Sequence, residues 1–110
     1  MIENAVEKYK NKERSPHVIT DAGDYLLCPI CANEYMAHET IEVFDHHEGN
    51  KQETHITISE GKMSSDHDLS GNPSGKRNGL KISFKCENCK RSSVLKIAQQ
   101  EGLTYMAFEV

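Results

Sequence analysis

Four cysteines, the only ones in this 110-residue chain, stand in two C-x-x-C motifs. The first motif holds Cys28 and Cys31, and the second holds Cys86 and Cys89. Each motif presents two thiolates from one tight turn, and two such turns facing each other supply the four soft sulfur ligands of a closed tetrahedral zinc site. The pattern therefore predicts one structural zinc ion per chain, bound by these four residues.

Two other chemistries use paired cysteines. Disulfides would need an oxidising compartment, but the residues after Met1 contain no apolar run typical of a signal peptide, and no segment approaches membrane-spanning length. We therefore expect a cytoplasmic protein with reduced thiols and no membrane contact. A redox dithiol usually lies where a strand leads into a helix, and neither motif opens a helical pattern. Metal binding is the favoured interpretation, with disulfides and redox chemistry as alternatives.

A catalytic role for the metal is disfavoured. Four thiolates leave no coordination position for water and reduce the Lewis acidity of zinc. The deaminase pattern, in which a proline precedes the C-x-x-C motif, is absent because Pro29 lies inside the motif. Since all four cysteines are assigned to the zinc site, no cysteine remains to act as a nucleophile. The sequence predicts a protein that is not an enzyme and has no small-molecule substrate.

The net charge of −4 hides an uneven distribution. Residues 28–70 contain nine acidic and two basic residues, whereas residues 75–96 contain seven basic residues and one acidic residue. A basic segment beside a zinc-binding turn is typical of a phosphate-binding surface, although a solvated face that balances the acidic residues explains the same pattern. The candidate nucleic-acid-binding residues are Lys76, Arg77, Lys81, Lys85, Lys90, Arg91 and Lys96.

The elements that would position these residues are mostly strands. A hydrophobic content of 36% without Trp gives only a thin core, which a metal ion would help to hold together. Alternating apolar and polar residues predict strands, at 25–27, 39–44, 55–59, 80–85, 92–98 and 104–110.

Two further segments are predicted from spacing and composition. Ile2, Ala5, Val6 and Tyr9 are spaced as on one face of an amphipathic helix over residues 1–14. Residues 60–79 are rich in Gly, Ser, Asp and Asn, and this composition predicts a flexible loop.

Together these elements predict a mainly β fold, a zinc ribbon elaborated into a small antiparallel sheet with a short N-terminal helix. Residues 1–23 would form the helix or a tail with a connector, and residues 24–110 the ribbon domain, with an inserted hairpin at 39–59 and the loop at 60–79. The 54 residues between the two motifs are tolerable, because loop closure costs only about 0.6 kcal/mol more per doubling of length. In Ala32-Asn33, after the first motif, Asn33 would replace the usual glycine in a left-handed turn.

Several segments resemble an uncharacterised family of small zinc-ribbon proteins found in bacterial genomes, plasmids and prophages. The resemblance covers about residues 24–102. It is carried by Leu26–Cys31, Glu42–Phe44, Asn72–Gly79, Ile82–Cys89 and Leu95–Gln99. The resemblance implies a ribbon fold and a four-cysteine metal site, and it makes the Asn72–Gly79 segment part of the family pattern.

Six histidines offer further ligands. Because four cysteines already suffice, each histidine is expected to be a surface residue. Replacement of one cysteine ligand, or a second metal site with Asp45, Glu48 or Asp66, stays open. The histidines are His17, His38, His46, His47, His55 and His67.

One alternative is catalytic. Asp45–His47, with Asn50 and the two C-x-x-C motifs, resembles an HNH-type nuclease, in which a histidine activates water and a divalent ion stabilises the phosphate. That resemblance implies a histidine and a helix after the second motif, where Lys90–Ser93 and a strand pattern stand instead.

The favoured hypothesis is a zinc-binding protein that serves as a nucleic-acid-binding module. A protein–protein interaction module is the alternative, because an exposed strand edge can pair with a partner.

Overall fold

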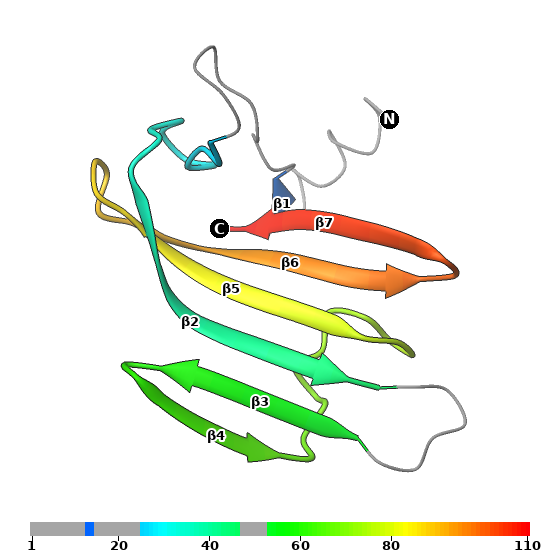
Figure 1. Cartoon of the computed structure of the whole chain (residues 1–110). Coiled ribbons are helices and arrows are strands. Elements are labelled where there is room, and N and C mark those ends of the chain that lie inside the picture. Colours follow the sequence, from blue (N-terminus) through cyan, green and yellow to red (C-terminus); the bar gives the residue numbers. More distant parts are fainter. Residues whose placement is uncertain (1–12, 15–24, 47–52) are drawn as a thin grey trace.

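The computed structural model describes residues 13–14, 25–46 and 53–110 (Figure 1). This part of the chain forms one antiparallel sheet with strand order β1-β7-β6-β5-β2-β3-β4, so the predicted mainly β, antiparallel fold is confirmed. Among these residues there is no helix with the length and apolar character needed to cross a membrane. The strands are β1 (Glu13–Arg14), β2 (Met36–Asp45), β3 (Thr54–Ser59), β4 (Lys62–Asp66), β5 (Gly79–Cys86), β6 (Ser92–Gln100) and β7 (Leu103–Glu109).

The helix predicted over residues 1–14 lies outside the described residues except at its end. There Glu13 and Arg14 form β1 and pair with β7. These two residues are extended rather than helical, which corrects that boundary. Pairing with β7 satisfies backbone groups that a helix end would leave open.

Two hairpins have the shortest connections in the sheet. Glu60 and Gly61 join β3 to β4 with φ values of 52° and 76°, and Glu101 and Gly102 join β6 to β7 with 49° and 82°. Two successive left-handed residues are the type I′ turn, whose twist matches that of the flanking strands. Glycine in the second position of each turn fixes both registers.

Register brings a row of large apolar residues, one from each of five strands, onto one side, here named the apolar face. Side chains directly opposite one another across a sheet share a face. One row runs from β3 to β7 through Ile58, Ile41, Ile82, Leu95 and Phe108. Leu95 and Phe108 are buried, at 6% and 0% exposure. The buried residues of this face therefore lie on β6 and β7, and Phe84 of β5, on the same face, meets Phe108 edge to face with ring centroids 6.2 Å apart.

The opposite side of the sheet, here named the polar face, carries the residues that alternate along each strand with those of the apolar face. Phe44 of β2 is 1% exposed there and stacks on His55 of β3, with ring centroids 4.5 Å apart. Gly71, in the connection between β4 and β5, lies against the same face. A Cβ added to Gly71 would stand 3.5 Å from both the Phe44 ring and Lys81 Nζ. The connection thus covers the Phe44 end of the polar face.

Two secondary-structure predictions are wrong in detail. The loop predicted over residues 60–79 contains β4, which pairs with β3 along all five of its residues. Its sequence, Lys-Met-Ser-Ser-Asp, has one apolar residue because β4 is an edge strand with every residue exposed. The short strand predicted at Tyr25–Leu27 is reduced to a single bridge at Leu27.

The connection between β4 and β5 is held in place by side-chain hydrogen bonds. Ser74 is buried, and its hydroxyl donates to the carbonyl of Gln99 at 2.7 Å and accepts from the N–H of Arg77 at 3.0 Å. Asn72 accepts from the N–H of Ser74 and donates to the carbonyl of Arg77. Gly79 is required beside it, because a Cβ there would lie 2.1 Å from Asn72 Oδ1.

Candidate metal centre

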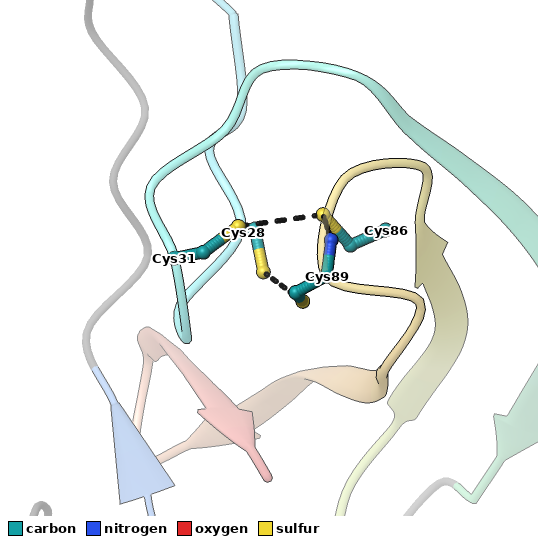
Figure 2. A group of neighbouring side chains, drawn as sticks. All are labelled: Cys28, Cys31, Cys86 and Cys89. Carbon is teal, nitrogen blue, oxygen red and sulfur yellow. Dashed lines mark hydrogen bonds between the residues drawn. The ribbon is translucent and has the colours of Figure 1, made fainter.

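Strand pairing brings the two C-x-x-C turns together at one end of the sheet. The first turn precedes β2, and the second joins β5 to β6. Met36, at the start of β2, pairs with Cys86, at the end of β5, and the N–H of Glu87 donates to the carbonyl of Tyr35 at 2.9 Å. β3 and β4 lie on the side of β2 that faces away from β5, so the long separation in sequence does not separate the two turns in space (Figures 1 and 2).

Both turns have the same backbone geometry. In each, the N–H of the first cysteine donates to the carbonyl five residues on, at 2.8 and 3.0 Å, and the N–H four residues on donates back to that cysteine's carbonyl, at 2.8 and 3.0 Å. The residue after the second cysteine is left-handed, with φ of 64° at Ala32 and 61° at Lys90. The prediction of Asn33 for this position is wrong by one residue, because the cysteine spacing fixes where the turn reverses.

Backbone and side-chain N–H groups point at the sulfur atoms. Ile30 donates its N–H to Cys28 Sγ, and Asn88 and Cys89 donate theirs to Cys86 Sγ, each at 3.4 Å. The Asn88 side chain also donates to Cys31 Sγ of the other turn, at 3.5 Å. Donors directed at sulfur stabilise thiolates, the form that binds metal.

The four sulfur atoms lie at the spacing of a tetrahedral metal site. All four are within 4.8 Å of one another (Figure 2), with separations of 3.9 Å between Cys28 and Cys89 and 3.5 Å between Cys31 and Cys86. A tetrahedron with metal–sulfur bonds of about 2.3 Å has edges of about 3.8 Å, whereas a disulfide requires about 2.05 Å. All four cysteines are free thiols in this structure, so the arrangement fits a metal ion and not a disulfide pair.

Local hydrogen bonds, burial and neighbouring thiols shift the pKa values of two of the thiols in opposite directions. Hydrogen bonds from the Asn88 side chain and the Asn33 backbone lower the pKa of Cys31 to about 6. The pKa of Cys89 is raised to about 11, because burial and the neighbouring thiols outweigh the hydrogen bond from the Arg91 backbone that lowers it. Four sulfur atoms this close cannot all be anionic without a cation among them, and a bound metal ion supplies that charge.

The cysteine cluster lies partly at the surface, because two of its side chains are buried and the other two are accessible to solvent. Cys28 and Cys86 are each 1% exposed, Cys89 is half-buried, and Cys31 is exposed. The first cysteine of each turn is thus buried, and the second lies nearer the solvent. Within the described residues, this is the one group of His, Cys, Asp and Glu side chains arranged to hold a metal ion.

The described histidines do not join the cluster. His46 follows the end of β2 remote from Met36, about 30 Å along the strand at about 3.3 Å per residue. Its N–H donates to Asn78 Oδ1, and its ring lies 3.8 Å from a carboxylate oxygen of Glu53. The other residues of the nuclease-like pattern, His47 and Asn50, lie outside the described residues, as do His17 and Glu48.

His55 has a role that sequence reasoning missed. Its two ring nitrogens lie 3.0 Å from a carboxylate oxygen of Glu42 and 2.9 Å from one of Asp66. The two carboxylates flank the ring from β2 and β4 and do not converge on a common point. Burial lowers the pKa of His55, but the hydrogen bonds that its ring donates to both carboxylates, and their negative charges, raise the pKa by more, so the net shift is upward. This histidine links three strands, and its protonated ring can donate to both carboxylates at once.

The central basic residues share the polar face. Lys81 and Lys96 stand directly opposite each other on β5 and β6, and Lys85 follows on the same side of β5. Lys81 Nζ donates to the carbonyl of Gly71 at 3.2 Å, and Lys96 Nζ lies 3.7 Å from a carboxylate oxygen of Glu109.

The remaining basic residues stand at the two ends of β5. Lys76–Arg77 are exposed in the connection before this strand, and Lys90–Arg91 are exposed in the second cysteine turn after it. The seven basic residues therefore lie along the length of β5 and β6 and are not gathered at one point.

Comparisons with family models, with curated proteins and with solved structures found no match. The resemblance to a zinc-ribbon family therefore stays a prediction, and the chemistry of the site rests on the geometry given above.

Proposed function

We propose that Cys28, Cys31, Cys86 and Cys89 bind one zinc ion as a structural cross-link, and that the protein is a non-enzymatic module that binds nucleic acid. The observation that carries the metal proposal is the convergence of four thiol sulfurs from two turns of identical geometry. Soft sulfur ligands in a tetrahedral set favour zinc over harder divalent ions. With all four positions taken by protein, the ion cross-links the turns and leaves no position for substrate.

Metal analysis of the purified protein tests this proposal, with one zinc per chain as the expected result. Removing the ion with a chelator should unfold the cysteine-bearing end of the sheet, and adding zinc back should restore it. Cys86→Ser should lose the zinc, whereas Ser92→Ala, an exposed change six residues away, should keep it. A fully folded, metal-free protein would contradict the proposal.

The nucleic-acid proposal is supported by the line of basic residues along β5 and β6. The eight residues of β5 extend about 27 Å, roughly the length of eight base steps at 3.4 Å each. Lys85 projects from the polar face between the two exposed basic pairs, Lys76–Arg77 and Lys90–Arg91. A nucleic-acid backbone following β5 would meet positive charge along this whole length.

Local acidic partners do not prevent such contacts. Lys90 Nζ lies 3.9 Å from a carboxylate oxygen of Glu87, but these side chains are 69% and 62% exposed. Exposed ion pairs contribute little free energy, so a phosphate can replace the carboxylate. The connection that carries Lys76–Arg77 is anchored by Ser74 and Asn72, which reduces the entropy lost when these residues bind.

Fluorescence titration of labelled single-stranded and duplex oligonucleotides with zinc-loaded protein, at several salt concentrations, tests the proposal. Lys76→Glu with Arg77→Glu, and Lys85→Glu, should weaken binding and reduce the salt slope by about 1 per lost phosphate contact. Arg14→Glu is the matched control, since it makes the same charge change on β1, three strands from β5. Equal effects of Lys85→Glu and Arg14→Glu, or binding that does not respond to salt, would contradict a specific phosphate-binding surface.

A further inference from the structure

The edge strand β4 is suited to pairing with another strand. It is the last strand of the sheet, and all five of its residues are exposed. Its inner edge pairs with β3, and its outer edge pairs with no other strand of the described chain (Figure 1). Strand edges of this kind carry backbone donors and acceptors that an added strand can satisfy.

The hairpin turn determines which backbone groups face outward. Ser59 and Lys62 flank the two-residue turn and pair with each other, so the backbone N–H and C=O groups of Lys62 point inward to β3. In an antiparallel ladder, inward-facing and outward-facing residues alternate. Ser64 and Asp66 therefore also point inward, and Met63 and Ser65 direct their N–H and C=O groups outward.

This alternation limits how two copies of β4 can pair. Outward-facing residues must stand opposite outward-facing residues, so a two-fold axis can lie at Met63, at Ser64 or at Ser65. Only the axis at Ser64 places Lys62 opposite Asp66 of the second copy at both ends. It also places Met63 opposite Ser65, which gives four backbone hydrogen bonds between the copies.

We propose that a second copy of this chain pairs with β4 in antiparallel orientation, about a two-fold axis at Ser64, to form one continuous sheet across the dimer. This interface uses the same surface on both copies, as a two-fold dimer requires. The inference rests on the sheet and its charges, and it is independent of the proposed nucleic-acid binding.

Charge complementarity favours a second copy as the occupant of this edge. Lys62 and Asp66 stand at opposite ends of β4 and both point to the polar face, so antiparallel self-pairing creates two opposite-charge pairs. The Asp66 side chain is 58% exposed, and it already accepts hydrogen bonds from His55 and from the N–H of Asp68. A carboxylate has about four acceptor sites, so it can accept from a lysine as well.

An apolar contact accompanies the pairing. Met63 is 73% exposed on the apolar face, beside Ile58, which is 40% exposed. In the proposed register the two Met63 side chains are diagonal neighbours, about 7 to 8 Å apart at their backbones and within reach of each other. Dimer formation therefore extends the apolar face from one copy into the next.

Sedimentation velocity of the zinc-loaded protein, from about 10 µM to about 1 mM, tests the proposal over the range in which weak complexes dissociate. The wild type should change from monomer to dimer with concentration. Ser65→Pro removes one outward N–H without removing a bond to β3, so it should remain monomeric. Ser65→Ala keeps the N–H and should dimerise like the wild type.

A second variant makes the test independent of folding effects at position 65. Lys62→Glu places a glutamate opposite Asp66 of the second copy at both ends of the interface, and it should weaken dimerisation at least tenfold at low salt. Wild-type protein that stays monomeric at about 1 mM, assembly beyond a dimer, or a Lys62→Glu variant that dimerises like the wild type would each overturn the proposal.

Discussion

Ala32, the residue after the first C-x-x-C motif, should be more favourable as glycine. Its φ of 64° is left-handed, which costs an L-residue about 1 to 2 kcal/mol because Cβ approaches the following carbonyl oxygen. Glycine removes that cost but raises the entropy of the unfolded chain, at about 0.5 to 1 kcal/mol. Ala32→Gly should therefore stabilise the folded protein by about 0.5 to 1 kcal/mol net, or about 2 to 6 °C in melting temperature.

Thermal unfolding followed by circular dichroism at a fixed free zinc concentration measures this difference, since bound metal makes the melting temperature depend on concentration. Ala37→Gly is the matched control, because Ala37 is exposed on β2 and undergoes the same chemical change in extended backbone. It should destabilise by about 0.5 to 1 kcal/mol. If both variants shift the melting temperature in the same direction, the turn geometry assigned to Ala32 is wrong.

Two further predictions concern residues away from the cysteines. Burial opposes the upward shift of the His55 pKa that Glu42 and Asp66 cause, but the net shift is upward. The stability that protonated His55 contributes is therefore fully present below the unfolded pKa of about 6.5 and is lost as pH rises through the higher folded pKa. Calorimetry of zinc-loaded protein across this range should give a stability difference between wild type and His55→Gln that shrinks as pH rises, and a constant difference would refute the protonation of His55. Gly79→Ala should lower the melting temperature by more than Ala37→Gly does, because its Cβ would stand 2.1 Å from Asn72 Oδ1. An unchanged melting temperature would show that the Asn72 side chain can move aside.

Most of the strands and the four-cysteine site could be predicted from the alternation of apolar and polar residues and from the cysteine spacing. The patterns around Ile82 and Leu95 are strictly alternating, and these residues lie in one row across the sheet. The four cysteines converge because the first motif precedes β2 and the second follows β5, and these two strands pair so that both motifs lie at the same end of the sheet. These features depend on local spacing, which a single sequence contains.

The features that were missed depend on register or on backbone conformation. β4 has one apolar residue, so its pairing with β3 follows from the Glu60–Gly61 turn and not from hydrophobic alternation. The environment of His55 requires three strands to be aligned, and only then do Glu42 and Asp66 flank it.

The connection before β5 was likewise beyond what composition could predict. A composition rich in Gly, Ser and Asn predicts a loop. Ser74 is nevertheless buried, and its hydroxyl donates a hydrogen bond to the carbonyl of Gln99, a residue of β6 that is distant in sequence. Composition gives the chance of local order and does not identify such partners.

The most direct test of the central claim is X-ray absorption at the zinc edge, measured on protein purified without added metal. The four-thiolate site predicts a signal from one zinc per chain, with four sulfur neighbours at about 2.3 Å and no nitrogen or oxygen ligand. A first shell containing nitrogen or oxygen would show that a histidine, carboxylate or water occupies a position assigned to cysteine, and protein that lacks zinc while keeping its sheet would contradict a structural metal altogether.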